Sequence, residues 1–488
     1  MKLSKETIVL ILVSLLSFGF QLLFLFKIPF FSSSEAYFHY RHTKYIMEHF
    51  LPLVYDPQSY GGNVILNTHV WHYVLGFFDV WLPDVIVYKI IPALLAIGVI
   101  LIVYRFAKEL TGSIPAATFS ALLSAFIPIY LSQTLNQVPL LSIFLPTLFL
   151  CLVFFLNIEK KKKHFLLLAL FLVLLNPLNL LMLLTLLFFM ILTFAEAIPV
   201  HGEEKEAVGF LVAFFLFINL VFYKQLYIEK GLATIWQNLP LELYGHIFQG
   251  FDLFQTIALI GVVPLVLGII GFVLYREKKR PMIILQSLLA ADFLLLLLRL
   301  IPFEEGVLVL AVTLCITAGV SIQRLAIYLP LTKMARLTKP VLGAVVVLSL
   351  ASILIPSWIV ATDVITTGVT AEEIEALEWI RDSTPVGSVI AGSVYEGNLI
   401  IVLANRTNII DTQFLLAENR IRDVGTIFTT ESLVKAKRAL DPYNADYIYF
   451  SRRTMDLYGI EELKYTKDET CFETVFKNEF ATVYEVVC

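Results

Sequence analysis

Apolar runs of about twenty residues recur along most of this chain, and they limit its fold more than any other feature. A helix needs about 20 residues to cross the hydrocarbon core of a bilayer. The composition agrees, because 58% of the residues are hydrophobic and only 16% are charged, whereas soluble domains carry about 25% charged residues. We therefore expect a polytopic α-helical membrane protein with about eleven transmembrane helices. The runs lie at 1–26 and near 85–106, 114–131, 138–157, 164–176, 178–197, 207–224, 256–275, 281–299, 306–323 and 340–360.

The orientation of these spans follows from the basic residues, which gather in short cytoplasmic loops. The first run begins with Lys2 and Lys5, reaches the length of a bilayer-spanning helix and lacks a small-residue cleavage site, so we interpret it as an uncleaved anchor. The Asn176-Pro177 step divides 164–197, and counting two spans there places nearly all basic loops on one side. We therefore predict an N-terminus inside and a C-terminus outside. The basic loops are 105–108, 160–163, 196–206, 276–280 and 324–339.

This topology places three segments on the outer face of the plasma membrane. They are an outer loop at 28–84 with interfacial helices, a loop at 224–255, and everything after the last span. We divide the chain into a transmembrane domain at 1–360 and an extracellular soluble α/β domain at 361–488. Thr370 and Glu373 mark the start of an amphipathic helix in that domain by a capping-box pattern. We expect strands at 388–392, 399–404, 408–411, 445–450 and 481–487, and a further helix near 431–440.

Cysteines and short motifs exclude several classes of protein. Cys471 and Cys488 share the outer, oxidising side and can form a disulfide, and two free thiols are the alternative. No CxxC pair, P-loop, GxGxxG, GxSxG, HExxH or EF-hand pattern is present. We find no basic patch of the kind that nucleic acid requires. The sequon at Asn405 lies between predicted strands, and we interpret it as a turn.

A polar segment at 29–72, PFFSSSEAYFHYRHTKYIMEHFLPLVYDPQSYGGNVILNTHVWH, follows the first span and contains five of the eight histidines. We expect an interfacial helix capped by Ser34. Glu35, His39 and His42 are spaced four and three residues apart, so they share one face. That face can bind a divalent metal ion or present a base to an acceptor hydroxyl. The alternative is an amphipathic helix that lies on lipid headgroups.

Other polar residues allow two interpretations each. Asp56 begins an Asp-Pro-x-Ser sequence that is typical of a turn, and it is also a candidate acid. His69 and His72 can be satisfied polar residues at the mouth of the next helix. Arg299 lies at the outer end of a span, against the positive-inside trend, where it can contact a phosphate or diphosphate group. It can equally be a snorkelling side chain paired with a neighbouring glutamate.

Three stretches resemble one superfamily of membrane enzymes. EAYFHYRHTKYI, followed by YDPQSYGG and WHY, resembles the first outer loop of GT-C glycosyltransferases, which include archaeal oligosaccharyltransferases and protein mannosyltransferase-like enzymes. LEWIRDSTPVGSVIAGSVYEGNLIIVLANRTNIID resembles the start of the exported domain of archaeal oligosaccharyltransferases. RLIPF at Arg299 resembles the start of a late span in enzymes of this superfamily that use lipid donors.

The resemblance implies an inverting enzyme that takes a sugar from a polyprenyl (dolichyl) phosphate at the outer leaflet and transfers it to a protein or glycan acceptor. Glu35 takes the place of the catalytic Asp of the family, with Asp56 as a supporting acid. Arg299, with Arg41, implies a contact to the donor phosphate. The other substrate-binding candidates are His39, His72, Tyr395 and Glu396. Mg²⁺ or Mn²⁺ is the candidate cofactor, with Glu35 as its candidate ligand.

The sequence departs from the family pattern at three places. The acid is Glu35 rather than Asp, the second outer loop at 132–138 has no acidic pair, and 394–397 reads VYEG where the acceptor motif of the family would lie. We predict transfer of a single sugar rather than of a whole glycan. The alternative is a non-catalytic GT-C-like protein that binds or translocates lipid-linked glycans. A secondary transporter is a third alternative, but the spans show no repeated halves.

Overall fold

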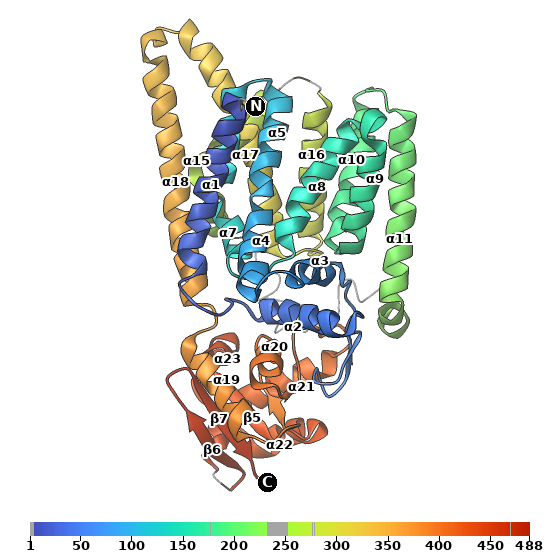
Figure 1. The fold of residues 1–488 in the computed structure, drawn as a ribbon, viewed down its shortest axis with the longest axis vertical. Coiled ribbons are helices and arrows are strands. Elements are labelled where there is room, and N and C mark those ends of the chain that lie inside the picture. The colour runs from blue at the N-terminus through green and yellow to red at the C-terminus, as the bar shows by residue number, and fades with distance from the viewer. Residues whose placement is uncertain (1–3, 176, 232–251, 276, 278, 469) are drawn as a thin grey trace.

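A computed structural model describes residues 4–175, 177–231, 252–275, 277, 279–468 and 470–488. The helices form a long bundle at one end, and a C-terminal domain with a β-sheet lies at the other end (Figure 1). The polar segment at 29–72 and the helix that follows it lie between the two, and we call this region the polar layer. Most of the predicted outer loop at 224–255 falls on residues outside this description. Because the polar layer lies where the two bodies meet, we expect the functional site there.

Each predicted span coincides with a helix or a bent pair of helices. Among the described residues, six helices are long and apolar enough to cross a membrane, or eight if each bent pair is one span. The count of about eleven and the orientation therefore remain predictions. The bundle comprises α1 (Lys5–Leu25), η1 (Ile86–Ile90), α4 (Ile91–Ala96), α5 (Gly98–Thr111), α6 (Ile114–Ser124), α7 (Pro128–Thr134), α8 (Leu141–Leu156), α9 (Ile158–Leu175), η2 (Pro177–Asn179), α10 (Leu180–Ala195), α11 (Gly202–Lys230), α14 (Leu253–Ile260), α15 (Val262–Leu274), α16 (Arg280–Leu297), α17 (Phe303–Tyr328) and α18 (Thr338–Thr366).

The turn between α9 and α10 supports the division of the apolar region at 164–197 into two helices. The amide nitrogen Nδ2 of Asn179 donates hydrogen bonds to the carbonyl oxygens of Leu172, at 3.3 Å, and Val173, at 2.9 Å. These bonds satisfy carbonyls that the end of a helix leaves without partners. Pro177, two residues before Asn179, cannot continue the preceding helix without distortion. The chain therefore reverses at this point.

The polar layer holds α2 (Ser34–His49), α3 (Val70–Asp79) and a hairpin of β1 (Tyr55–Asp56) and β2 (Asn63–Val64). The N-cap of α2 is Ser33, whose hydroxyl accepts a hydrogen bond from the amide of Ala36 at 3.2 Å. The prediction of Ser34 as the cap was therefore wrong by one residue, because Ser33 has the extended backbone that a cap requires.

Buried Lys89 fixes the connection from α1 to this layer, which the sequence did not reveal. Its ammonium donates to the carbonyl oxygens of Leu25, Ile28 and Phe30, at 3.1, 2.7 and 3.2 Å. The three donors of the ammonium are thus all used. The segment that leads into α2 is held at a fixed place by one side chain.

The C-terminal domain contains a five-stranded sheet in the order β4-β3-β5-β7-β6. Strands β4, β3 and β5 are parallel, and β5, β7 and β6 are antiparallel. Its elements are α19 (Ala371–Ser383), β3 (Val389–Ala391), α20 (Gly397–Leu399), η5 (Ile400–Ala404), β4 (Thr407–Asn408), α21 (Glu418–Thr429), α22 (Leu433–Leu440), β5 (Tyr447–Ser451), α23 (Arg452–Tyr458), β6 (Phe472–Lys477) and β7 (Ala481–Val486).

The expected strand at 399–404 is wrong, because this stretch continues α20 as a π-helical turn. Leu399, Ile400 and Ala404 are all fully buried, and a short run that is buried on every side does not show by its pattern whether it is helix or strand. The turn ends at Asn405, whose φ of 50° is left-handed, which agrees with the turn predicted for the sequon.

The start of α19 follows the prediction only in part. The Thr370 hydroxyl accepts a hydrogen bond from the amide of Glu373 at 3.2 Å, as a cap does. The Glu373 carboxylate, however, binds the guanidinium of Arg453 at 3.0 Å instead of returning to the cap. This buried pair joins α19 to α23.

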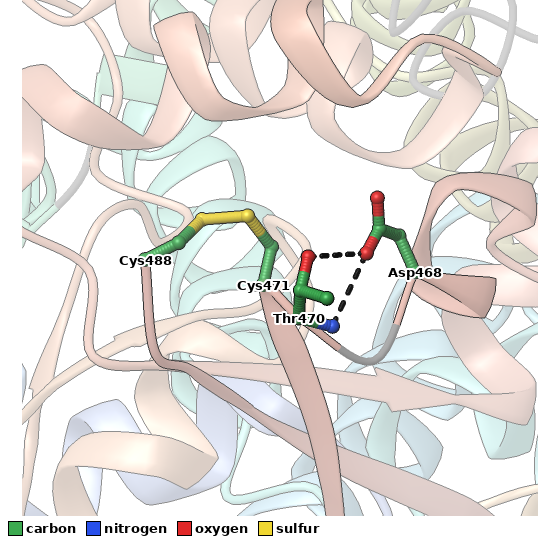
Figure 2. Close-up of a disulfide and its surroundings, with 4 residues drawn as sticks. All are labelled: Asp468, Thr470, Cys471 and Cys488. Atoms are coloured by element: carbon green, nitrogen blue, oxygen red, sulfur yellow. Dashed lines mark hydrogen bonds between the residues drawn. A yellow bond between two sulfur atoms is a disulfide. The ribbon is translucent and has the colours of Figure 1, made fainter.

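The structure contains the disulfide between Cys471 and Cys488, which links β6 to the C-terminal end of the chain (Figure 2). Beside it, the Asp468 carboxylate accepts hydrogen bonds from the amide and the hydroxyl of Thr470. The bridge closes a loop of 17 residues, which stabilises a domain by about 3 kcal/mol in the chain-entropy description. The other two cysteines, Cys151 and Cys315, are buried in the bundle.

Titration of the purified protein in denaturant will count these thiols. We expect two reactive thiols, from Cys151 and Cys315, without reductant and four after reduction. The Cys471→Ser variant is expected to show three thiols in both conditions, because Cys488 loses its partner. Four thiols in the unreduced protein would contradict the disulfide.

Candidate functional site

The first turn of α2 is held between the two bodies of the protein. Ala36 is buried in the hydrophobic core of the bundle, whereas the next residue, Tyr37, is buried in a core of the C-terminal domain. Glu35 precedes them in the same turn, and its side chain remains 71% exposed. The helix start favours a carboxylate there, because the backbone amides carry partial positive charge. Glu35 therefore lies where the bundle meets the C-terminal domain, at the first turn of α2. We call this junction the seam.

Other acidic residues approach this seam from α17. Glu305 lies close enough to both Glu35 and Glu304 for the three carboxylates to interact electrostatically. Tyr395, from the loop after β3, interacts in the same way with Glu304. Glu304 and Glu305 occupy the first turn of α17, which begins at Phe303 after the N-cap Pro302. The seam thus gathers an acidic and phenolic set from α2, α17 and the C-terminal domain.

The pKa of Glu35 is raised above its ordinary value by desolvation. Its carboxylate is open to water, yet protein atoms on several sides displace much of the surrounding solvent. A carboxylate with a raised pKa is a stronger base than an ordinary one, which suits proton abstraction.

Four buried histidines lie directly behind Glu35. The Nε2 atom of His39 lies 3.8 Å from a Glu35 oxygen, and the Nδ1 atom of His39 lies 2.9 Å from Nε2 of His72. Nδ1 of His72 in turn lies 3.2 Å from Nδ1 of His69. The fourth ring, His42, stacks on the rings of His69 and His72. Two helices of the polar layer, α2 and α3, bring the cluster together.

Burial lowers the pKa of every imidazole in this cluster. The pKa of His39 falls to about 3 and that of His69 to about 4, in both cases by desolvation. The pKa values of His42 and His72 are also lowered, by desolvation and then by the neighbouring imidazoles. All four rings are therefore neutral at physiological pH, which leaves Glu35 as the charged group of this face.

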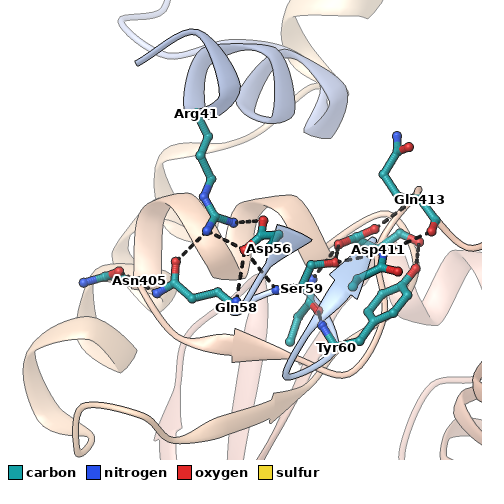
Figure 3. Close-up of polar contacts among 10 residues, drawn as sticks. Arg41, Asp56, Gln58, Ser59, Tyr60, Asn405, Asp411 and Gln413 are labelled. Carbon is teal, nitrogen blue, oxygen red and sulfur yellow. Dashed lines mark hydrogen bonds and ion pairs between the residues drawn. The ribbon is translucent and has the colours of Figure 1, made fainter. Parts of the chain in front are cut away.

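Asp56 and Arg41 form a structural pair (Figure 3). Their ion pair is 2.6 Å long, and Asp56 also accepts hydrogen bonds from the amides of Gln58 and Ser59. Asp56 is 2% exposed, so the geometry favours the turn interpretation over the catalytic one. Arg41 donates a further hydrogen bond to the Gln58 side chain, and its guanidinium is thus engaged in holding the hairpin.

The tip of the same hairpin is inserted into the C-terminal domain (Figure 3). The Ser59 hydroxyl donates to a carboxylate oxygen of Asp411 at 2.6 Å, and the Tyr60 hydroxyl donates to the backbone carbonyl of Asp411 at 3.1 Å. The Tyr60 amide donates to the Asn408 side chain at 3.0 Å. Because the Tyr60 ring is also part of the domain's hydrophobic core, the outer loop and the domain form one unit.

The other predicted site residues, Glu396, Tyr395 and Arg299, differ in how deeply they are buried. Glu396 is fully buried, and it accepts hydrogen bonds from the amide of Ser393 and the hydroxyls of Ser451 and Thr454, so it organises the domain. Tyr395 is half-buried at the seam. Arg299 is exposed in the turn between α16 and α17, with a left-handed φ of 55°. This turn delivers Arg299 at the same end of the bundle as the α17 glutamates.

Glu35, the predicted metal ligand, does not belong to a metal site among the described residues. Among the residues that the structure describes, no group of three or more His, Cys, Asp or Glu side chains could hold a metal ion. In the second outer loop, the amide of Asn136 donates to Phe30 and Ser32, which anchors the start of α2. The described side chains therefore do not fit Mg²⁺ or Mn²⁺.

Comparison with solved structures identifies the fold. The apo oligosaccharyltransferase of Archaeoglobus fulgidus superposes with a TM-score of 0.69 at 14% identity, over 96% of this chain and 73% of that one. ArnT from Cupriavidus metallidurans, bound to undecaprenyl phosphate, gives a TM-score of 0.59 at 10% identity, over 98% and 97%. The chain has the GT-C fold. No protein-family profile and no curated protein sequence matches it.

A second oligosaccharyltransferase structure, the A. fulgidus AglB with an inhibitory peptide and a dolichol-phosphate, gives a TM-score of 0.62 at 16% identity over 96% of this chain and 72% of that one. The resemblance predicted from the first outer loop is therefore confirmed at the level of the GT-C fold. Sequence reasoning did not place Glu304 and Glu305 beside Glu35. The signal was an acidic pair after Pro302 at the outer end of a span.

A double-mutant cycle will test the structural assignment of Asp56 and Arg41. Breaking a fully buried ion pair costs about 3–5 kcal/mol of stability. We expect Asp56→Asn to cost less, about 2–3 kcal/mol, because Arg41 is partly exposed. The loss in Arg41→Met/Asp56→Asn should be smaller than the sum of the single losses. Thermal unfolding of each variant in detergent measures its loss of stability. Strictly additive losses would show that the two side chains do not interact.

Proposed function

We propose that this protein is an inverting glycosyltransferase that uses a polyprenyl-phosphate sugar as its donor at the outer face of the plasma membrane. The observation that carries the proposal is an exposed carboxylate with a raised pKa, Glu35, at the seam between a GT-C bundle and its C-terminal domain. Two proteins of this fold are known with a polyprenyl phosphate, AglB with dolichol-phosphate and ArnT with undecaprenyl phosphate.

The chemistry needs one base and one cationic group at the seam. Glu35 accepts the proton of the acceptor hydroxyl, the acceptor oxygen attacks the anomeric carbon, and the bond from that carbon to the phosphate oxygen breaks with inversion. Arg299 lies on the exposed turn at the same end of the bundle, where a guanidinium stabilises the developing charge of the leaving polyprenyl phosphate. Tyr395, half-buried in the C-terminal domain, contacts the acceptor.

The acceptor is a polypeptide or a glycan, and the C-terminal domain presents it. An A. fulgidus oligosaccharyltransferase of this fold is known with a tethered acceptor peptide. The disulfide between Cys471 and Cys488 supports an extracellular domain, because such bonds persist on the oxidising side of a membrane. A division of the chain near residue 360 follows from this arrangement, with the transmembrane part before it and the extracellular part after it.

A second candidate function is a non-catalytic protein that binds or translocates lipid-linked glycans. One observation favours it: in the described part of the chain, no side-chain group could hold a metal ion, and Glu35 stands where the family has Asp. This protein would bind a polyprenyl-phosphate sugar without forming any glycosylated product.

The substitution Glu35→Gln will separate the two functions. We expect transfer from a polyprenyl-phosphate sugar to fall by about 10²–10⁴-fold, the usual contribution of a general base, while donor binding is retained. Glu48→Gln is the matched control, because Glu48 is exposed at the other end of α2, and it should keep full activity. Full transfer by the Glu35 variant would exclude Glu35 as the base. Wild-type donor binding without product would favour the non-catalytic function.

The pH profile should show the raised pKa of Glu35. The base acts only when deprotonated, so kcat/KM should fall on the acidic side with an apparent pKa above the ordinary value of 4.5. Glu35→Asp should keep an acidic limb, whereas the residual activity of Glu35→Gln should lose it. Initial rates between about pH 4 and pH 9 measure the limb. A wild-type limb at the ordinary carboxyl value would contradict a raised pKa of Glu35.

A further inference from the structure

Arg420 is held between two tyrosine rings where the outer-loop hairpin meets the C-terminal domain. Its guanidinium carbon lies 5.0 Å from the ring centre of Tyr60, at the hairpin tip, and 5.0 Å from that of Tyr443, which follows α22. Both distances are within the range of a cation–π contact. The Tyr60 hydroxyl donates to the carbonyl oxygen of Asp411. The Tyr443 hydroxyl donates to the carboxylate of Asp423. The two anchored rings therefore hold the guanidinium in one orientation.

The guanidinium of Arg420 keeps most of its hydrogen-bonding capacity. An arginine side chain has five N–H donors. Among the described residues, that of Arg420 makes one hydrogen bond, from Nη1 to the carbonyl oxygen of Ile409 at 3.3 Å, and no ion pair. The carboxylate of Asp411 accepts from the Ser59 hydroxyl, and that of Asp423 accepts from Tyr443. Arg420 therefore presents a fixed positive charge with free donors.

The free donors of Arg420 adjoin two cavities. One has a volume of about 350 Å³ and the other of about 110 Å³, and Tyr60 and Tyr443 line both of them as well. The larger volume is within the range of small-molecule sites and far above the volume of one water molecule, about 30 Å³. We call the larger cavity the arginine recess. It is lined by residues of both the hairpin and the C-terminal domain.

Two asparagine side chains add polar groups to the arginine recess. Asn63, from the hairpin, donates through Nδ2 to Ser59 and Gln413 at 3.4 Å, and within the described part of the chain its Oδ1 atom accepts no hydrogen bond. Asn419, beside Arg420 in the first turn of α21, is exposed. An amide can both donate and accept hydrogen bonds. The recess thus combines one cation with two neutral groups that suit hydroxyl partners.

These groups together match a sugar that carries a carboxylate. The planar fork of an arginine binds a carboxylate through two parallel hydrogen bonds. The hydroxyl groups of a sugar ring both donate and accept, as the two amides do. A neutral sugar leaves the charge of Arg420 without a partner. An acidic peptide side chain or inorganic phosphate engages Arg420 but brings no sugar hydroxyl groups to Asn63 and Asn419.

We propose that the arginine recess binds a hexuronic acid residue, a sugar with a carboxylate at its sixth carbon, within a glycan. Arg420 binds the carboxylate, and Asn63 and Asn419 bind hydroxyl groups of the ring. This binding site goes beyond the proposed transfer reaction. It is compatible with the non-catalytic function too, because both functions involve sugars, and it requires no chemistry at Glu35.

The binding test uses probes that differ at one carbon of the sugar. Glucuronic acid, glucose and glucose 6-phosphate are titrated against the full chain in detergent and followed by ligand-observed NMR. We expect glucuronic acid to bind at least about 10-fold more tightly than glucose, as hydrogen bonds to a charged group imply. Equal binding of these two, tighter binding of glucose 6-phosphate, or no binding would overturn the proposal. N-acetylglutamate binding as tightly as glucuronic acid would assign the recess to an acidic peptide instead.

Two variants and a control locate the bound sugar. Arg420→Gln should weaken glucuronic acid binding by about 10–100-fold. Arg422→Gln is the matched control, because Arg422 is exposed on the same helix and does not line the recess, and it should bind like the wild type. Because Arg420 also packs between two rings, Asn419→Asp is the second variant. It leaves the stack intact and adds a carboxylate that repels that of the sugar. Unchanged glucuronic acid binding in Asn419→Asp would overturn the proposal.

The variant Glu35→Gln separates this site from the transfer reaction. It should bind glucuronic acid with wild-type affinity, because Glu35 does not line the recess. Wild-type protein that binds glucuronic acid but transfers no sugar would reject the transfer function and support the arginine recess. Wild-type protein that transfers a sugar but does not bind glucuronic acid would overturn the arginine recess alone.

Discussion

The site depends on α2 belonging to two hydrophobic cores at once. Ala36 packs into the bundle and Tyr37 into the C-terminal domain, so neither body can shift without displacing the helix. Close-packed interiors resist such displacement, because even small voids are costly. These two contacts also fix the backbone position of Glu35, one residue earlier in the same helical turn. A flexible loop could not hold this carboxylate 3.8 Å from His39 and within electrostatic reach of Glu305.

The four histidine rings beside Glu35 in the polar layer are uncharged. The ion pairs of this layer are those of Arg41 with Asp56 and of Lys44 with Asp79 and Asp84. The buried rings next to Glu35 are uncharged, so the charge of that carboxylate is not cancelled by a nearby cation. Desolvation by the surrounding protein atoms raises the affinity of this carboxylate for protons.

The sequence predicts the helices well and the site only in part. Bilayer length and basic loops are properties of contiguous residues, so the bundle elements and the break at Asn176-Pro177 could be anticipated from local patterns. The exposed Glu35 at a helix start and the disulfide partners are local as well. The run at 399–404 could not be assigned, because a short, continuously apolar run lacks the periodicity that separates helix from strand. The approach of Glu304 and Glu305 to Glu35, or of Asp411 to Ser59, joins residues hundreds of positions apart.

The hairpin tip has a consequence for biogenesis. Its hydrogen bonds to the C-terminal domain span 347 to 352 residues, so the first outer loop emerges from the ribosome long before its partner exists. Tyr60 has no partner for these bonds until residues 408–411 have been synthesised, and contacts of such long range form slowly. The polar layer can therefore close only after this part of the C-terminal domain has been made. Until then the cell holds an inserted bundle whose seam is incomplete.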